Sequence, residues 1–474
     1  MPKAAKAAIW FTFCNFFVSG LSFLTGPIFT RILSPDEYGI LTLYITYEQI
    51  LLILATWEIY NGAFQRGLFK YEGSWGQYTQ STISLINLLT VSAFVFVLMF
   101  NGAISEFTRM PPLTLTLLFV YLITYPAYFQ FLTIKRTEYD YKVVVGLSVL
   151  YSLLNIGISL AAILIVNRTA QVKYNATLIV AILFSFYFYL TGLYNKGSRL
   201  RLSEVKPQWK FMIDYQAPLV LHSLSYLVLG QADRVMIGKM VGDSQAAFYG
   251  VAYTLASAIT IMQVSLNGAL TPWRFQKLKE EKYELVGKTT IMIMVLLGVS
   301  ILAVVLVSPE VLRVLFTPDY YEAVWSIPPI SISIFFMFLY SSFVAVESYY
   351  EKTKYIMYVS VFCGLINIGL NYVLIPIFGY IVCGYTTLFS YVLFALLHYM
   401  CMKIVCRSVI PGIRIFNLKT IVLISLAVII CSVLFTILYP YWMARYFIVL
   451  FILVIGWKRR NQIAAIMADL KTGK

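Results

Sequence analysis

The tetrapeptide Leu154-Asn155-Ile156-Gly157 returns in the second half of the chain as Ile366-Asn367-Ile368-Gly369, and both copies lie inside long apolar segments. Two further pairs repeat at nearly the same spacing, namely Asn61-Gly62-Ala63 with Asn267-Gly268-Ala269 and Tyr38-Gly39 with Tyr249-Gly250. Three matches close to one period indicate an internal duplication. Because the matched segments come in the same order and orientation, the sequence predicts a parallel repeat. Such repeats are typical of transporters and place ligand binding between the two halves.

The composition around these repeats is that of an integral membrane protein. Hydrophobic types make up 60 % of the 474 residues and charged types 12 %, against roughly 45–50 % and 25 % in a soluble domain. At about 20 residues per bilayer crossing plus a short connection, the chain has room for about fourteen helices and no sizeable soluble domain. This excludes a membrane-tethered soluble enzyme, a secreted disulfide scaffold and a nucleic-acid binder.

Apolar runs bounded by charge or by Pro and Gly predict an all-α polytopic membrane protein with about fourteen transmembrane helices. The predicted helices span residues 8–29, 39–61, 81–101, 112–133, 142–166, 176–194, 212–232, 246–270, 286–308, 322–346, 355–377, 381–402, 418–438 and 441–457. We expect an N-terminal lobe of helices 1 to 6 (1–205), a C-terminal lobe of helices 7 to 12 (206–410), and two extra helices with a cytoplasmic tail (411–474).

The distribution of basic residues predicts the orientation of these helices. Most of the 36 Lys and Arg residues fall at the termini and in the connections that follow even-numbered helices. The positive-inside rule therefore places both ends of the chain in the cytoplasm. The apolar segment after Lys3 and Lys6 shows no cleavage pattern and is expected to stay as the first helix. The six cysteines show no metal spacing, so neither disulfides nor a cysteine metal site is expected.

Charged side chains inside apolar segments cost free energy, which makes each of them a candidate functional residue. Glu48 and Glu58 lie almost three turns apart on one predicted helix, and we expect them on one face. They either line a hydrated cavity or take part in structural pairing. Asp233 and Arg234 are either a cavity acid beside a cation that extends to the surface, or a local ion pair.

Two arginines and the two histidines complete the candidates. Arg66 and Arg274 end the two repeat-related helices on the predicted cytoplasmic side, where they would flank the inner mouth of a cleft. Guanidinium groups stay charged and bind phosphate bidentately, as a diphosphate headgroup requires, although topology alone also places basic residues there. His222 either carries protons or is structural. His398 is expected at the membrane interface.

The segment from Thr30 to Gly39, TRILSPDEYG, resembles the signature loop of bacterial polysaccharide exporters of the Wzx type. These belong to the multidrug, oligosaccharidyl-lipid and polysaccharide flippase superfamily. Residues 232–238 and 370–376 agree with this resemblance, as do Gly379 and Gly384. It implies two six-helix lobes in a V, around a cavity that opens alternately to each side. The implied cargo is an oligosaccharide linked through diphosphate to undecaprenol, flipped from the cytoplasmic to the outer leaflet of the bacterial inner membrane.

The resemblance also collects the candidate residues into roles. The candidate anion-binding cations are Arg31, Arg66, Arg234 and Arg274, and the candidate cavity or coupling acids are Glu48, Glu58 and Asp233. Related flippases bind sodium in the second lobe, and the matching groups here are Asp233, Asn367, Asn371 and Thr386 or Thr387. Asn371 stands where an acidic ligand would strengthen that site. A proton carried by one of the acids is therefore an equal rival to sodium.

No cofactor is expected, and no metal beyond the candidate sodium site. The expected partners are the lipid-linked glycan, membrane lipid and, from family context, a polysaccharide polymerase and a chain-length regulator; the protein itself is expected to be a monomer. Two other functions stay open. One is a cation-coupled multidrug antiporter of the same superfamily. The other is a membrane enzyme acting on lipid-linked sugars, for which the longest predicted outer loop, Ser308 to Glu322, offers no catalytic constellation.

Overall fold

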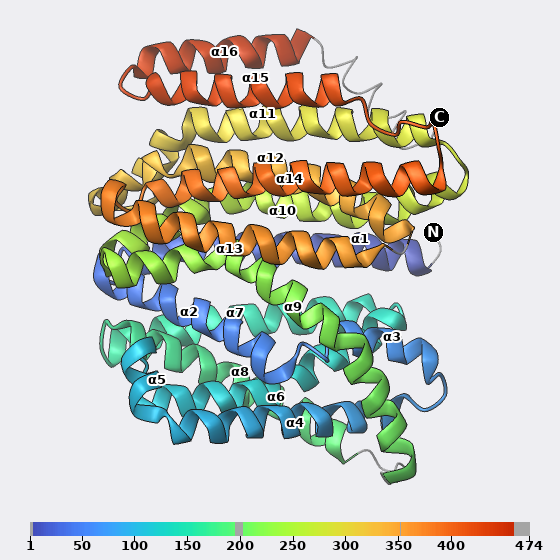
Figure 1. Ribbon diagram of the computed structural model, residues 1–474. Helices are drawn as coiled ribbons and strands as arrows, with labels where there is room; N and C mark the ends of the chain where they lie inside the picture. The colour runs from blue at the N-terminus through green and yellow to red at the C-terminus, as the bar shows by residue number, and fades with distance from the viewer. Residues whose placement is uncertain (1–2, 195–201, 351, 459–474) are drawn as a thin grey trace.

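The computed structural model describes residues 3–194, 202–350 and 352–458, and these residues form helices without a strand (Figure 1). The first helices are α1 (Lys3–Thr30), α2 (Pro35–Thr56), α3 (Gly62–Lys70), α4 (Trp75–Met99), α5 (Asn101–Thr108), α6 (Pro112–Thr137), α7 (Tyr141–Ile165) and α8 (Ala170–Leu193). The remaining ones are α9 (Leu202–Met240), α10 (Asp243–Lys279), α11 (Tyr283–Leu315), the 3-10 helix η1 (Pro318–Trp325), α12 (Ile327–Tyr349), α13 (Thr353–Phe378), α14 (Val382–Val409), α15 (Leu418–Ile437) and α16 (Trp442–Lys458).

Each predicted segment corresponds to one long helix, which confirms an all-α polytopic membrane protein. Within the described residues, twelve helices are long and apolar enough to cross a bilayer. Two predicted spans are not among these twelve. Polar side chains such as Gln216 and His222 interrupt α9, and α16 has only 17 residues. The predicted tail after Lys458 and the basic residues 196–201 lie outside the described residues.

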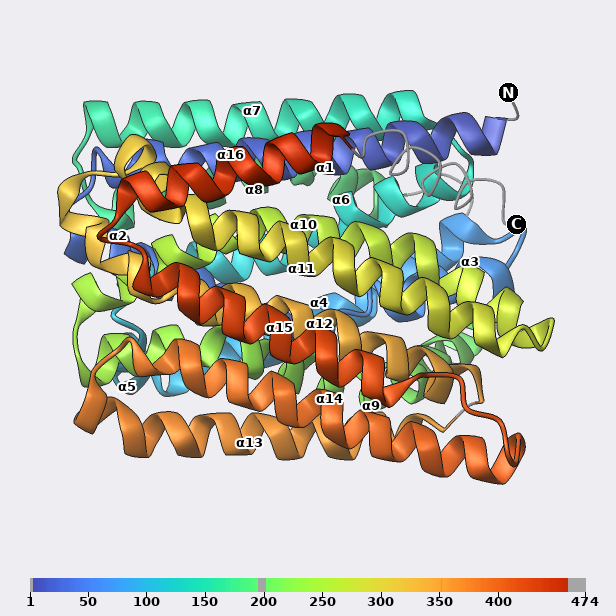
Figure 2. The same ribbon diagram turned by 90° about the horizontal axis from the view of Figure 1, so that it is seen from above.

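The helices form two groups, and Figure 1 shows most of the C-terminal helices above the N-terminal ones; Figure 2 looks down on this stack from the C-terminal side. The N-terminal group comprises α1 to α8, where α6 packs on α8 and α8 on α7. The C-terminal group comprises α10 to α16, where α12 packs on α14 and α14 on α13. Contacts between the groups run mainly from α2 to α10, with α1 lying between α7 and α10. Since α2 and α10 carry equivalent parts of the sequence repeat, equivalent helices meet where the groups join.

α12 is the central helix of the C-terminal group. Its residues are buried without interruption from Ile327 to Leu339, and α10, α11 and α14 pack around it. A helix that is apolar on all sides is stable only when it is enclosed in this way. The C-terminal group therefore has its own continuous core.

α9 contacts both groups. Trp209 in its first half donates to the Ser81 backbone oxygen of α4, and Gln216 accepts from the Ala63 backbone N–H of α3. In its second half Ser360 of α13 meets His222 at 3.3 Å. Pro218 lies between the two halves, where proline removes a backbone hydrogen bond and favours a bend. Figure 1 shows α9 as a bent helix. The predicted domain boundary at residue 205 stays a prediction.

The two copies of the repeated tetrapeptide lie on α7 and α13. Asn155 donates to the Thr177 backbone oxygen of α8, and Asn367 donates to the Ser390 hydroxyl of α14. Each asparagine thus bonds to the helix that follows its own in the chain. The surroundings differ, because Asn367 is fully buried whereas Asn155 is only partly covered.

The last two helices, α15 and α16, pack on the rest of the C-terminal group mainly through α11. Arg445 of α16 is buried and donates to the Leu306 backbone oxygen and to the Glu310 carboxylate at 2.6 Å. At the other end of α11, a methyl group built at Gly287 would overlap the Ile415 backbone oxygen, which belongs to the segment leading into α15.

We expect Gly287→Ala to lower the thermal stability of the detergent-solubilised protein. Overpacking at a tight contact costs about 1–3 kcal/mol. The matched control is Gly146→Ala in α7, where nothing lies within 4 Å and alanine gains helix propensity. Thermal unfolding of the two variants should move in opposite directions; equal midpoints would show that the Gly287 contact does not constrain the structure.

Candidate functional site

The Asp233 carboxylate of α9 lies at the centre of a fully buried polar cluster. Its Oδ1 accepts from the Asn371 amide of α13 at 2.7 Å, and its Oδ2 accepts from the Thr387 hydroxyl of α14 and the Tyr249 hydroxyl of α10, each at 2.6 Å. All four side chains are 0 % exposed. Four helices of the chain therefore place one carboxylate among three neutral donors.

A second ring of polar groups supports this cluster. Thr386 donates to the Asn371 amide oxygen, and the Asn371 amide reaches the Asn367 oxygen at 3.4 Å. Ser390 extends this network by accepting from the Asn367 amide at 3.3 Å. The predicted cation-site residues are thus brought together, and the sequence interpretation missed Tyr249 and Ser390. Tyr249 belongs to a repeated dipeptide, so the repeat itself carried a signal for it.

The donor set has the chemistry of a site for a small hard cation. Carboxylate, amide and hydroxyl oxygens are the ligands that such ions prefer. The single carboxylate gives the site one negative charge, which matches a monovalent cation or a proton. No group of three or more His, Cys, Asp or Glu side chains suited to a metal occurs among residues 3–194, 202–350 and 352–458.

Arg234 follows Asp233 in the sequence, but its side chain contacts other residues. Its guanidinium lies 4.6 Å from the Tyr253 ring centroid of α10 and donates to the Gln231 side chain. No ion pair joins Arg234 to Asp233 within the described part of the chain. The structure therefore shows no local ion pair between the two residues, and the role of Asp233 as a cavity acid stays a prediction.

The other predicted arginines lie at separate places. Arg31 is exposed between α1 and α2 and donates to the Val314 backbone oxygen at 2.9 Å, whereas Arg66 is exposed on α3 beyond the opposite end of α2. A 22-residue helix such as α2 is about 33 Å long. Arg31 and Arg66 therefore cannot contact one headgroup together.

Arg274 was predicted to flank the open inner mouth of a cleft, but in the structure it is buried. Its side chain is 1 % exposed, stacks 5.4 Å from the Phe338 ring centroid and donates to the Ser342 hydroxyl at 2.9 Å. Its second terminal nitrogen, Nη1, has no hydrogen-bond partner in the structure. An unsatisfied buried guanidinium is costly and marks Arg274 as a residue that needs a further partner.

The prediction that Glu48 and Glu58 share a helix face is wrong. α2 ends at Thr56, and Trp57 and Glu58 follow with positive φ angles of 53° and 50°. Glu58 therefore belongs to a turn outside the helix. Glu48 is half-buried and accepts from the Tyr174 hydroxyl of α8 at 2.9 Å, which places it toward the interior of the N-terminal group.

His398 was expected at the membrane interface, and this is also wrong. It is 0 % exposed and lies 3.0 Å from Glu347, a carboxylate that the sequence interpretation did not single out. Glu347 falls just beyond the predicted helix 322–346, so no apolar run pointed to it. A pairing over fifty residues leaves no local pattern in the sequence.

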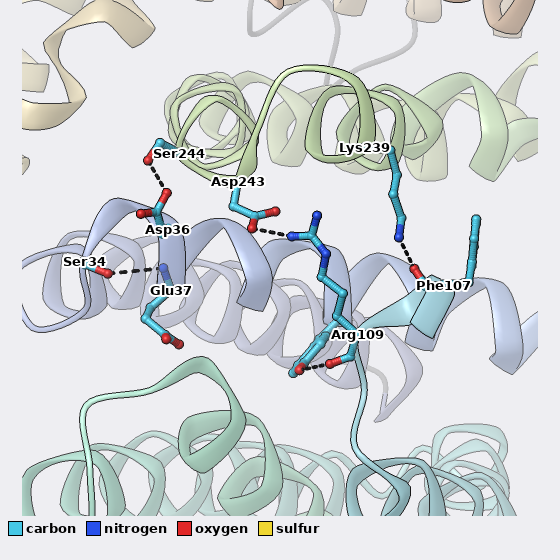
Figure 3. A network of polar contacts seen from close by, with 9 residues as sticks. Ser34, Asp36, Glu37, Phe107, Arg109, Lys239, Asp243 and Ser244 are labelled. Carbon is cyan, nitrogen blue, oxygen red and sulfur yellow. Dashed lines mark hydrogen bonds and ion pairs between the residues drawn. The ribbon is translucent and has the colours of Figure 1, made fainter. Parts of the chain in front are cut away.

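Polar contacts join the two groups where α2 and α10 begin (Figure 3). Ser244 donates to Asp36 at 2.5 Å, Arg109 pairs with Asp243, and Lys239 donates to the Phe107 backbone oxygen. We call these contacts the interlobe latch. It lies at the end of the bundle that the distribution of basic residues predicts to be external.

The first turns of α2 and α10 fit closely beside the latch. Ser34 caps α2 by accepting from the Glu37 N–H, and Pro35 takes the first helical position. One turn later, a methyl group built at Gly39 would overlap the Asp243 backbone oxygen. Glycine is therefore the residue that permits the two helices to approach this closely.

At the far end of α10, three lysines in and beside the connection to α11 pair with carboxylates of the same segment. Lys277 and Lys282 pair with Glu280 at 2.9 and 3.0 Å, and Lys288 pairs with Glu284 at 2.7 Å. Hydrogen bonds from the two lysines lower the pKa of the Glu280 carboxyl to about 2.

Comparison with known proteins places this arrangement in a family. The family model described as polysaccharide biosynthesis protein matches residues 4–278, and the MatE model matches residues 218–373. Protein 1 of the Lsg locus of Haemophilus influenzae is 28 % identical over 110 residues. That match covers 22 % of this chain and 27 % of the relative.

Solved structures share the fold at low sequence identity. The lipid II flippase MurJ in an inward closed conformation has a TM-score of 0.68 at 13 % identity, with 96 % of this chain and 100 % of that chain covered. A multidrug transporter of the MATE family in an inward-facing conformation has a TM-score of 0.63 at 14 % identity, with 84 % and 99 % covered. An outward-facing MATE structure gives 0.58 at 15 % identity, with 85 % and 94 % covered.

The fold and the family matches define a polytopic membrane transporter rather than an enzyme. The chain belongs to the polysaccharide biosynthesis protein family, whose model covers more than half of it. With that family it belongs to the multidrug, oligosaccharidyl-lipid and polysaccharide flippase superfamily. The resemblance carried by the Thr30 to Gly39 segment is thereby confirmed.

Proposed function

We propose that this flippase moves undecaprenyl-diphosphate-linked oligosaccharide repeat units from the cytoplasmic to the outer leaflet of the bacterial inner membrane. The observation that carries the proposal is the family match over residues 4–278. A polar headgroup cannot cross hydrocarbon unaided, because its hydroxyls and charges would lose hydration without replacement. A path between two helical groups would supply that replacement while the polyprenyl tail stays in lipid.

Alternating access would use the interlobe latch as its outer closure. Exposed ion pairs and hydrogen bonds contribute only about 0–1 kcal/mol each, so the latch can open and close reversibly. The latch contacts are formed in this structure, which is therefore closed at this end. Both chain termini would then lie in the cytoplasm.

The cation would bind at the Asp233 cluster and bias the cycle. Asp233, Asn371 and Thr387 would hold a sodium ion or a proton, with Asn367 and Thr386 behind them. In the structure three donors satisfy the Asp233 carboxylate, so a bound cation would have to displace them. Because the cluster joins α9, α10, α13 and α14, that rearrangement would act on helices that reach the other group.

Arg66 and Arg274 would bind the diphosphate at different stages. Arg66 is exposed on α3 and accessible from the predicted cytoplasmic side, whereas the free Nη1 of Arg274 lies deeper within the C-terminal group. We expect Arg66→Ala and Arg274→Ala each to reduce glycan flux severalfold without preventing membrane insertion. Flux in proteoliposomes, normalised to the amount of folded protein, measures this; normal flux in the double variant would remove both residues from the mechanism.

The proposal is tested in cells by depletion of the protein. Undecaprenyl-diphosphate oligosaccharide should then accumulate in the inner leaflet and become inaccessible to a lectin added to spheroplasts. Unchanged lectin labelling of the lipid-linked glycan would contradict the proposed cargo. The MatE match over residues 218–373 keeps a cation-coupled multidrug antiporter as the second candidate, and it predicts dye retention in depleted cells instead.

A further inference from the structure

Glu347 and His398 form an ionisable pair inside the C-terminal group, away from the Asp233 cluster. Glu347 lies near the end of α12 and His398 on α14, and His398 Nδ1 is 3.0 and 3.2 Å from the two carboxylate oxygens. Both side chains are 0 % exposed. The Tyr340 ring stacks on the imidazole with centroids 5.9 Å apart, and the Phe394 ring meets its edge at 4.7 Å. Aromatic side chains thus separate the pair from the cluster.

The described groups around the pair leave it without a further charged partner. The other ionisable groups recorded near it are Tyr340 of α12, whose ring stacks on the imidazole, His222 of α9, and the thiols Cys401 and Cys406 of α14. Within the described residues, α10, α11, α13 and α15 contribute no ion pair to it. The second imidazole nitrogen of His398 is buried without a hydrogen-bond partner.

A buried carboxylate next to an imidazole can bind one proton between them. With one shared proton the pair is electrically neutral, whichever partner carries it. Loss of that proton leaves a buried carboxylate without compensation, and gain of a second leaves a buried imidazolium; both states are costly in a low-dielectric interior. Imidazole is also the side chain whose charge changes within the physiological pH range.

We propose that Glu347 and His398 form a proton-binding site of the C-terminal group, distinct from the Asp233 cluster, whose occupancy is linked to the transport cycle. The link to transport rests on the proposed function; proton binding itself does not. His398 and the cluster residue Thr387 are eleven positions apart on α14, which is about 16 Å along a helix. The two sites are therefore separate in space.

The link to transport follows from the contacts of α12. One to two turns before Glu347, Ser341 meets Asn267 of α10 at 2.9 Å and Ser342 accepts from Arg274 of the same helix at 2.9 Å. α10 is in turn the helix that contacts α2 of the other group. A change of charge where α12 meets α14 therefore acts on the helix that holds α10. Glu347 and His398 are positioning residues in this scheme and do not contact the cargo.

The presence of only two histidines makes proton binding directly measurable. In the full-length His222→Gln variant, labelled with ¹⁵N-histidine and reconstituted in proteoliposomes, His398 gives the only imidazole signal in magic-angle-spinning NMR. We expect this signal to change between the neutral and the charged pattern as the pH of the proteoliposomes is varied. Adding Glu347→Gln should move that titration by about one pH unit or more, because a charge within 4 Å is removed.

Two results of the NMR experiment would overturn the site. A His398 signal that is independent of pH would show that the imidazole is structural. A titration that Glu347→Gln leaves unchanged would show that the two residues do not share a proton. Because neither readout depends on transport, the experiment decides the site even if wild-type protein flips no glycan, an outcome that would refute the proposed function alone.

Transport measured against pH tests the link. We expect His398→Gln and Glu347→Gln each to change the shape of the profile of glycan flux against pH. The double variant Glu347→Gln/His398→Gln keeps two neutral groups that can hydrogen-bond, and it should fold and give flux that varies less with pH than the wild type. A profile that falls equally at every pH, with its shape unchanged, would overturn the link to transport.

Discussion

Replacement of Gly39 with alanine is expected to lower glycan flux at least about tenfold. The added methyl group would overlap the Asp243 backbone oxygen, so α2 and α10 could not approach as they do here. Overpacking of this kind costs about 1–3 kcal/mol, and about 1.4 kcal/mol already changes a two-state population tenfold. The latch contributes little free energy of its own. The conformation that is closed at this end should therefore become a minor population in the variant.

The shift is measurable as a distance between the two groups. Spin labels at Glu106→Cys on α5 and Val241→Cys after α9 would report on the separation across the latch, since both positions are exposed. We expect longer distances in Gly39→Ala than in wild type. The matched control is Gly157→Ala on α7, where nothing lies within 4 Å, and it should behave as wild type. Wild-type distances together with wild-type flux in Gly39→Ala would contradict the role of this contact.

Replacement of Asp233 with asparagine is expected to abolish the dependence of flux on the coupling cation and to lower flux roughly tenfold or more. The variant keeps the size of the side chain but removes the only charge of a cluster in which three donors point at the carboxylate. Loss of one partner from a fully buried polar network costs several kcal/mol. Flux measured against a sodium gradient and a proton gradient separates the two cations.

Two further variants give this prediction its controls. Asn371→Asp places a second carboxylate in the cluster and should strengthen the response to sodium if sodium is the coupling cation. Glu48→Gln changes the other candidate acid, which lies in the N-terminal group against Tyr174. If Glu48→Gln abolished the cation dependence while Asp233→Asn kept it, the assignment of the cation to the Asp233 cluster would be contradicted.

Most of the fold could be predicted because hydrophobic burial in a bilayer leaves a strong mark on the sequence. Apolar runs of about 20 residues fixed the long helices to within a few residues at most ends. The end of α2 could not be predicted in this way. Two consecutive residues with positive φ, Trp57 and Glu58, terminate the helix inside an apolar run, and neither residue type signals that conformation. For that reason the prediction that Glu48 and Glu58 share a helix face was wrong.

For the site residues, too, local sequence patterns could predict only part of what the structure shows. Asp233, Asn371 and Thr387 could be grouped only through the resemblance to known flippases, since nothing local in the sequence shows that three helices bring them together. The burial of individual polar side chains also left no local pattern in the sequence. Arg274 and His398 both lie at predicted helix ends, where long polar side chains usually reach water, yet each is enclosed by other helices. Tertiary packing decided their environment.

The central claim is that this protein flips lipid-linked glycan, and the most direct test uses purified protein in proteoliposomes. These would carry a polyprenyl-diphosphate oligosaccharide in the inner leaflet and a cationic dye as a parallel cargo. A glycan-modifying enzyme added outside reports how fast headgroups reach the outer leaflet. We predict protein-dependent exposure of the glycan without movement of the dye. Dye efflux driven by a sodium or proton gradient, with no exposure of the glycan, would contradict the account and assign the protein to the multidrug antiporters.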